Sequence, residues 1–300
     1  KLKQKTQDLE NTLRELQRTQ TQLVQSEKMS SLGQLVAGVA HEINNPVNFI
    51  FGNLVHANEY VKSLLAIIES YQKHYPNPAL EVQEEIEAAE LDFLMEDFPK
   101  LIGSMQIGAE RIREIIAALR NFSRLDEAEY KLVDIHSGID STLMILHNRL
   151  KPRPDSPGIQ VIKNYGNLPQ VECYPGQLNQ VFMNILVNAI DALEDRDKGR
   201  PIQDLKKNPS FIIITTKSVE SESKVRIKIT DNGLGIPENV QNRIFDPFFT
   251  TKALGKGTGL GMSISYQIIT EKHHGTIECV SAAGEGAEFI IDLPIRIKKS

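Results

Sequence analysis

The position of the glycines is the feature that most restricts how this 300-residue sequence can fold. Residues 1–128 hold only five of the nineteen glycines and are rich in Gln, Glu, Leu and Ala, whereas four glycines occupy every second position from Gly255 to Gly261. Segments rich in straight-chain residues favour helices. Glycines between short apolar runs mark turns and close backbone approaches. The sequence therefore predicts a helical first part and a mixed α/β second part.

Length and charge limit the classes of function. At roughly 150 residues per domain, the chain has room for about two domains. Residues 1–128 carry 13 Lys and Arg against 19 Asp and Glu, and residues 129–300 carry 21 against 20, so neither part has the basic surface of a nucleic-acid-binding protein. No apolar run approaches the ~18 residues of a membrane span. We expect this stretch of chain to contact neither nucleic acid nor membrane.

The first residue and the cysteines bear on where the chain belongs. The sequence begins at Lys1 without a basic and apolar leader, so we interpret it as part of a longer protein. Cys173 and Cys279 show no metal-ligand spacing and are too few for a disulfide framework, which is typical of a reducing cytoplasm. We therefore expect a cytoplasmic chain without a zinc or redox centre.

The first 28 residues carry a narrow apolar stripe. Leu2, Leu9, Leu16 and Leu23 recur at intervals of seven, which is the spacing of a coiled-coil seam. A solitary solvated helix is the alternative, but a lone helix with so thin a stripe is only marginally stable in water. We expect residues 1–28 to form a parallel coiled-coil dimer.

Residues 29–126 show helical spacing in two runs. The first has a bend expected at Pro46 and stops at the proline-containing turn of residues 75–78. The second repeats apolar residues at intervals of three and four over residues 101–119. This pattern predicts a helical hairpin, and two such hairpins make a dimeric four-helix bundle. The eight carboxylates of residues 81–97 are interpreted as a solvated face near the hairpin tip.

The spacing changes from about residue 127. Apolar alternation predicts six strands, with three helices interleaved among them. This order favours an α/β sandwich with a mixed sheet over residues 127–300. The polar run of residues 194–209 is interpreted as an exposed, mobile loop without chemistry. We expect strands at residues 130–134, 159–165, 211–217, 225–231, 275–280 and 288–293, and helices at residues 137–150, 176–193 and 261–272.

The first candidate for chemistry is His41, in the segment His-Glu-Ile-Asn-Asn-Pro. On a helix it stands off the apolar stripe and shares a face with Asn45, four residues on. A neutral imidazole is nucleophilic near pH 7, and the neighbouring Glu42 can orient the ring and accept a proton. A surface His beside a Glu has no chemical role in most proteins, so this segment gains weight only from the motifs that follow.

Asn184 and Asn188 lie one turn apart on a predicted helix whose other face is apolar. Two carboxamides near a buried face are explained if their oxygens approach a hydrated divalent cation held between the protein and a triphosphate. A structural pair of amides is the alternative.

Two glycine-containing segments follow. Gly233 and Gly235 come directly after a predicted strand and allow a tight turn against a flat ring, while Asp231 can accept a hydrogen bond from an exocyclic amine. The alternating glycines of residues 255–261 stand before a helix, where amide groups, the helix N-terminus and a lysine such as Lys252 can surround phosphates. The spacing is not that of the Gly-x-x-x-x-Gly-Lys-Ser/Thr loop, so it predicts a different phosphate site.

The order of these motifs resembles that of the sensor histidine kinases of two-component systems, over residues 28–295. The His41 segment resembles the phosphoacceptor box, residues 184–191 the asparagine box and residues 231–235 the first glycine box. Residues 245–252 resemble the phenylalanine box, and residues 255–261 the glycine box of the lid. The forms Asn-Ala-Ile-Asp-Ala and Pro-Phe-Phe-Thr-Thr-Lys are similar to the subgroup that includes the nitrogen-regulatory kinases.

The resemblance implies a dimerisation and phosphotransfer bundle followed by a Bergerat-type ATP-binding domain. It makes His41 the phosphorylated nucleophile and Glu42 its base and orienting group. It also makes Asn45 the residue that positions water when a partner is dephosphorylated.

In the ATP-binding domain, the resemblance implies that Asn188 is a Mg²⁺ ligand with Asn184 nearby. Asp231 accepts from the adenine amine, at a turn that contains Gly233 and Gly235. The residues implied to surround the phosphates are Thr251, Lys252, Gly257, Thr258, Gly259, Leu260 and Gly261.

The implied activity is that of a histidine kinase. A homodimer uses ATP and Mg²⁺ to phosphorylate itself, passes the phosphoryl group to an Asp of a response regulator receiver domain, and also dephosphorylates that regulator. The resemblance also implies an upstream sensor region, which we expect to be missing from this chain. One alternative is a Bergerat-type ATPase that hydrolyses ATP to drive clamping, but this chain has Asn184 where such enzymes need a catalytic Glu. The other is a silent scaffold that binds nucleotide as a structural ligand.

The sequence departs from the family pattern at two places. Asp191 stands where some relatives carry a Lys near the phosphates, so it is left out of the expected site. The hairpin tip, roughly residues 70–100, exceeds the usual short connection between the two helices. We expect the tip to carry a contact peculiar to this protein.

Overall fold

A computed structural model of the chain describes residues 42–123, 130–154, 156–252 and 259–296, together with Lys5 and Thr12. These residues belong to two compact units, one within Ala37–Ala117 and one that contains the chain from Ala118 onward. The predicted coiled coil over residues 1–28 lies outside the described residues except for Lys5 and Thr12, both helical. The coiled coil and the domain boundaries at residues 28 and 126 stay predictions.

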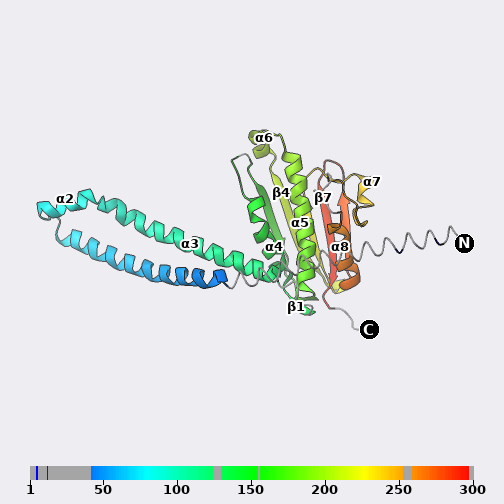
Figure 1. Ribbon diagram of the computed structural model, residues 1–300, viewed down its shortest axis with the longest axis horizontal. Coiled ribbons are helices and arrows are strands. Elements are labelled where there is room, and N and C mark those ends of the chain that lie inside the picture. The colour runs from blue at the N-terminus through cyan, green and yellow to red at the C-terminus, as the bar shows by residue number, and fades with distance from the viewer. Residues whose placement is uncertain are drawn as a thin grey trace. The chain divides into compact units, whose positions relative to one another are not determined.

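The first unit is a helical hairpin (Figure 1). Its first helix runs through residues 42–74 and ends where the proline-containing turn was expected. The chain returns in α3 (Leu91–Ser123), so the predicted hairpin is confirmed. Its tip is organised by a short helix that the sequence pattern did not reveal, α2 (Leu80–Ala88), which Glu90 separates from α3 with a left-handed φ of 49°.

One apolar seam joins the two long helices of the hairpin. Gln106 Nε2 also reaches across the seam and donates to the carbonyl oxygen of Leu54 at 3.3 Å. Spacing by sevens is that of helices that wind about each other. The buried residues with this spacing are Val47, Leu54 and Val61 on the first helix, and Ile102, Ala109 and Ile116 on α3.

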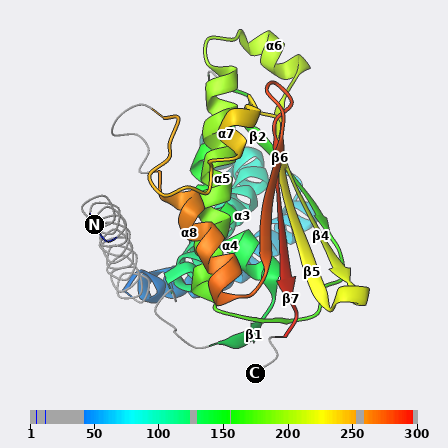
Figure 2. The same cartoon turned by 90° about the vertical axis from the view of Figure 1, so that its right-hand side faces the viewer.

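The second unit is built on a five-stranded sheet with the order β2-β4-β5-β7-β6 (Figure 2). β2 and β4 pair in parallel and the other neighbours pair antiparallel, which confirms the predicted mixed sheet. β1 and β3 form a separate antiparallel pair. The strands are β1 (Lys131–Val133), β2 (Ile159–Tyr165), β3 (Val171–Cys173), β4 (Ser210–Val219), β5 (Lys224–Asp231), β6 (Thr276–Ser281) and β7 (Ala287–Pro294).

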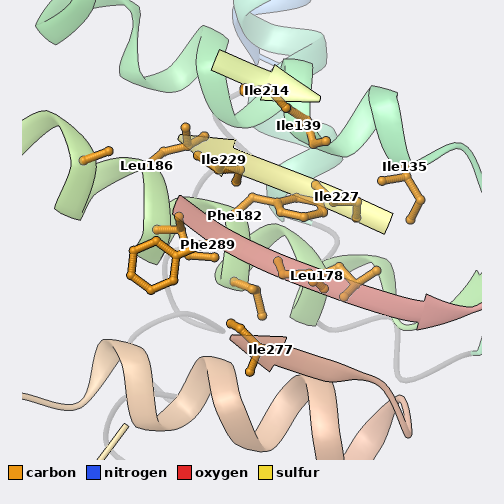
Figure 3. Packing of buried hydrophobic residues seen from close by; sticks show 14 of the residues in the cluster. Ile135, Ile139, Leu178, Phe182, Leu186, Ile214, Ile227, Ile229, Ile277 and Phe289 are labelled. Carbon is orange, nitrogen blue, oxygen red and sulfur yellow. The ribbon is translucent and has the colours of Figure 1, made fainter. Parts of the chain in front are cut away.

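Helices α4, α5 and α8 cover one face of this sheet (Figure 2). Residues of β5 are buried at every second position, as the alternation of strand side chains requires. Figure 3 shows Phe182 of α5 among Ile227, Ile229 and Phe289 from the strands. The helices are α4 (Ile135–Leu150), α5 (Pro175–Asp197), α6 (Ile202–Lys207), α7 (Glu238–Gln241) and α8 (Gly261–Gln267), with the helical turns η2 (Glu220–Glu222) and η3 (Ile268–Lys272).

The interpretation of residues 194–209 as a mobile loop without chemistry is wrong. α5 continues to Asp197 and α6 follows after a short connection. The side chain of Arg196 is only 12% exposed and pairs with Asp197 at 2.9 Å, because it is buried against the start of β4. None of the helices within the described residues is long and apolar enough to cross a membrane.

Candidate functional site

A cavity of about 860 Å³ opens beside the C-terminal half of α5 in the second unit. Its walls come from α5, the turn after β5, α7, the segment that ends at Lys252, and β7. This volume is in the usual range of small-molecule sites. The cavity brings together five residues that the sequence singles out, namely Asn188, Asp231, Gly235, Thr251 and Lys252.

Asp231 ends β5 and is only 4% exposed. Its Oδ1 accepts the backbone N–H of Gly233 at 2.8 Å. A Cβ atom on Gly233 would lie 2.8 Å from Oδ1 of Asp231 and 3.0 Å from the Cβ of Ala192, so a side chain there would push against the Asp231 carboxylate and α5. Burial raises the pKa of Asp231, while backbone N–H groups of Gly233 and Ala287 act against the rise. The wall of the cavity thus contains a buried hydrogen-bond acceptor.

The turn after β5 is fixed from two sides. On one side, Gly235 has a φ of 70°, and a Cβ atom there would lie 1.9 Å from the carbonyl oxygen of Ala282. On the other, Arg196 of α5 donates to the carbonyl oxygen of Asn232 and to Oγ of Ser210, each at 2.7 Å. One guanidinium therefore joins α5, β4 and the turn, which sets the position of the carboxylate before it.

Lys252 reaches α5 at a different point of the same cavity. Its Nζ donates to Oδ1 of Asn188 at 3.1 Å and to Oδ2 of Asp191. Arg149 of α4 donates to the other oxygen of Asp191 at 2.6 Å and pairs with Glu194 at 2.6 Å. Burial acts to raise the pKa of Asp191, but hydrogen bonds from Lys252 and Arg149 outweigh it and hold the pKa below its usual value. The carboxylate is therefore charged between two cations.

Asn184 joins α5 to the start of α8. Its Nδ2 donates to the carbonyl oxygen of Gly261 at 2.9 Å and to Oγ of Ser265 at 3.1 Å. A Cβ atom on Gly261 would lie 3.4 Å from the Asn184 side chain. Gly259 has a φ of 65°, and a Cβ atom there would lie 2.4 Å from the carbonyl carbon of Phe248. A Cβ atom at Gly259 would therefore clash with the backbone of Phe248, whereas one at Gly261 would make only an ordinary contact.

The other candidate residues are not brought into the cavity by the described part of the chain. Leu260 is buried at 7% exposure and does not line it. Glu42 and Asn45 are exposed at the start of the first helix of the hairpin, in the other unit. Three candidates lie outside the described residues, and they are His41, Gly257 and Thr258.

Sequence reasoning missed the cation behind Asp191 and most of the apolar lining. Arg149 is 42 residues away from Asp191, so only the packing of α4 on α5 reveals the contact. The sequence did indicate such a partner, because a carboxylate on the same helix face as Asn188 is partly buried and needs a cation nearby. The larger apolar residues in the walls include Leu234, Ile236, Val240, Ile244, Met262 and Phe289.

One family model matches the part of the chain that contains this cavity. Residues 173–297 match the family model described as Histidine kinase-, DNA gyrase B-, and HSP90-like ATPase. The matched region contains every residue that lines the cavity.

The relatives found along the whole chain are sensor kinases. The signal transduction histidine-protein kinase AtoS of Escherichia coli (strain K12) is 32% identical over 92% of this chain and 37% of its own length. The sensor histidine kinase ZraS of the same strain is 29% identical over 96% of this chain and 50% of its own length. The solved catalytic domain of histidine kinase ThkA has 27% identity and a TM-score of 0.45, over 56% of this chain and 96% of that one. The chain spans half or less of the two curated relatives.

Proposed function

We propose that this chain, whose residues 173–297 belong to the ATPase family shared by histidine kinases, DNA gyrase B and HSP90, is the transmitter part of a sensor histidine kinase. The resemblance inferred from the five sequence boxes is confirmed by relatives that carry that name. The proposed reaction transfers the γ-phosphoryl group of ATP to a ring nitrogen of His41, releases ADP and passes the ring proton to Glu42. The observation that carries the proposal is a cavity beside α5 that is lined by a buried carboxylate, Asp231, and by a lysine, Lys252, that α5 holds in place.

The cavity fits ATP by its chemistry. Asp231 is a buried acceptor for the exocyclic amine of adenine, and apolar side chains such as Ile236 and Met262 suit the faces of the ring. Lys252 and Thr251 suit the phosphates, because both line the cavity and one carries a positive charge. The proposed phosphate loop also uses the backbone of the chain before α8. Its residues are Gly257, Thr258, Gly259, Leu260 and Gly261.

Asn188 is the proposed Mg²⁺ ligand. Its Oδ1 already accepts a hydrogen bond from an ammonium group at 3.1 Å, so this oxygen faces positive charge. A single carboxamide oxygen is a suitable protein ligand for a cation whose other ligands are phosphate oxygens and water. When bound, Mg²⁺ neutralises charge on the transferred phosphate group. We propose that Asn184 acts indirectly, by holding α5 against α8.

The acceptor and the nucleotide are proposed to meet by movement of one unit against the other. Glu42 and Asn45 are exposed, which leaves both side chains accessible to a nucleotide-bearing domain or to a receiver domain. Glu42 holds the tautomer of the adjacent imidazole and takes its proton. Asn45, one turn further on the same helix, orients water for dephosphorylation of the regulator.

A homodimer is proposed from a second apolar seam on the hairpin. Next to the buried seam, each long helix carries exposed apolar residues that are also spaced by sevens. Side chains of this size are not left on a helix surface at every turn unless another helix covers them. A second hairpin of the same kind would complete a four-helix bundle. The exposed residues are Ile43, Ile50, Leu64 and Tyr71 on the first helix, and Leu94, Leu101, Phe98, Met105 and Ile112 on α3.

The remaining partners follow from the proposed class of enzyme. We expect a response regulator receiver domain as phosphoryl acceptor, an upstream sensor region, and a cytoplasmic location for this part of the protein. We expect no nucleic acid partner, because the charges of residues 129–300 nearly cancel, with 21 basic and 20 acidic side chains.

Phosphorylation of the His41→Gln variant tests the proposal. Incubation of the chain with Mg²⁺ and γ-labelled ATP should give an acid-labile, base-stable phosphoprotein, and the variant should lose this label while its affinity for ATP stays within about twofold. His56→Gln is the matched control, because His56 is an exposed histidine on the described helix of residues 42–74. It should be labelled like the parent chain.

Each alternative has its own outcome in this experiment. Labelling of His41→Gln at the parental level would overturn the assignment of the acceptor. ATP hydrolysis without a phosphoprotein would indicate the clamping ATPase. The structure argues against that enzyme, because the place of its catalytic Glu is taken by Asn184, whose amide donates hydrogen bonds to Gly261 and Ser265. Nucleotide binding with neither product would indicate the scaffold.

A further inference from the structure

We propose that Asp191 and Arg149 are positioning residues that hold Lys252 in place for the phosphates of the nucleotide. The inference rests on the proposed ATP-binding function and gives roles to two residues outside the site expected from the sequence. It is based on a chain of three contacts, from α4 through α5 to the segment before the lid.

The first step is that Lys252 needs support. A lysine side chain has four rotatable bonds, and fixing them costs conformational entropy. In this structure Lys252 is held by two oxygens of α5, one on Asn188 and one on Asp191. The cost of ordering the lysine is therefore met before a ligand arrives, and a preordered group binds its ligand more tightly.

The hydrogen bonds of Lys252 fix the direction of its ammonium group. Lys252 has three N–H groups, and the described residues provide acceptors for two of them. The third is left for an oxygen in the cavity that Lys252, Asn188 and Asp191 line together. A phosphate oxygen there would receive a charge-assisted hydrogen bond.

The negative charge of Asp191 must be neutralised if the carboxylate is to lie near phosphates. An unpaired carboxylate beside a triphosphate would repel it. Arg149 prevents this, because it binds Oδ1 at 2.6 Å while Lys252 binds Oδ2. The side chain of Asp191 is 27% exposed and that of Arg149 is 31% exposed, so the contacts are partly shielded from water. Arg149 itself does not line the cavity and reaches it through the carboxylates of Asp191 and Glu194, which do.

The positions of these groups allow a test in which two explanations give opposite signs. If Asp191 acts by positioning Lys252, its removal weakens ATP binding. If it acts on the phosphates directly, removal of its negative charge strengthens ATP binding. Adenosine is the reference ligand, because it shares the base with ATP and lacks the phosphates.

Titration calorimetry of the Asp191→Asn variant with ATP and with adenosine measures the effect. We expect the affinity for ATP to fall about tenfold, the loss typical of one charge-assisted hydrogen bond, and the affinity for adenosine to stay within about twofold. Arg149→Gln should lower ATP affinity in the same direction by a smaller factor. Normal adenosine binding also shows that each variant is folded.

The dependence on Lys252 is tested in a double variant. In the Lys252→Met background, Asp191→Asn should produce no further loss of ATP affinity, because the group that it positions is gone. Asp140→Asn is the control. Asp140 is a carboxylate of α4 that binds Lys163 at 2.7 Å away from the cavity, and its loss should leave the ratio of ATP to adenosine affinity unchanged.

Three results would overturn the inference. They are an unchanged or higher ATP affinity for Asp191→Asn, equal losses for ATP and adenosine, and a full additional loss in the Lys252→Met background. Failure of the proposed function itself looks different, because the parent chain would then bind no ATP.

Discussion

The two units of the molecule bury their apolar side chains in different ways. In the α/β unit, Ile185, Ile190 and Ile212 are 0% exposed and belong to one cluster that reaches from α4 to β7. In the hairpin, Leu54 is buried at 9% exposure, while Leu101, equally apolar, is 47% exposed. A closed core needs only its own chain, whereas a hairpin with an exposed seam needs another surface. We expect the α/β unit to be stable alone and the stability of the hairpin to depend on assembly.

The largest effect should come from the closed core. Phe182 is 1% exposed among β5 and β7 side chains, so Phe182→Ala leaves a cavity and should lower the free energy of unfolding of the α/β unit by about 3–5 kcal/mol. Urea unfolding followed by circular dichroism measures this. Leu132→Ala, at a position 48% exposed, is the control and should change it by about 0.5 kcal/mol or less. A similar loss in both variants would show that the core is not closed.

An intermediate effect should come from the exposed seam of the hairpin. Leu101→Asp would put a charge where a second hairpin is expected to pack, at a cost of about 3 kcal/mol in association, or roughly a hundredfold in Kd. Sedimentation should show a dimer for the parent chain and a monomer for the variant. Ser104→Asp adds the same charge at an exposed position outside both seams and should remain dimeric. A dimeric Leu101→Asp variant would contradict the proposed bundle.

The smallest effect should be a pH dependence confined to the α/β unit. His273 is 1% exposed, its Nε2 accepts the N–H of Tyr174 at 3.0 Å, and its Nδ1 donates to the carbonyl oxygen of Ile268 at 2.7 Å. Burial lowers the pKa of His273 below the usual 6.5, so the folded state favours the neutral ring. This contribution to stability is present above about pH 6.5 and is lost as the pH falls through the folded pKa.

Unfolding in urea at pH 7.5 and pH 5.5 tests this assignment. The parent chain should lose stability at the lower pH, and His273→Gln should lose less because Gln does not titrate. His56→Gln, in the hairpin and exposed, should keep the parental difference. An unchanged difference in His273→Gln would place the pH dependence elsewhere.

Long elements with a regular pattern were predictable from the sequence. Alternation in the apolar run of residues 159–165 gave β2 with its observed bounds, and the four alternate glycines marked the start of α8 at Gly261. Asp231 and Asn188 were found because carboxylate and carboxamide groups beside glycines or on an apolar helix are rare unless a ligand uses them. Both line the cavity.

Short elements and distant contacts were not predictable in the same way. β3 has three residues, too few for an alternation to show, and α6 has six, within a polar run. Arg149 looks like any surface arginine until α4 packs on α5, which depends on the whole sheet. Arg196 is similar, because its acceptors lie on Asn232, in the turn after β5, and on Ser210 of β4.

α5 contributes side chains both to the core and to the cavity of the α/β unit. All of its residues are described, and only Glu194 and Asp195 among them are exposed. Both of these line the cavity, so the exposed positions of the helix also serve the site. A substitution in α5 is therefore tolerated only if it suits the packing of the core and the chemistry of the cavity. In a library of random substitutions, α5 should be the most slowly varying helix of its unit.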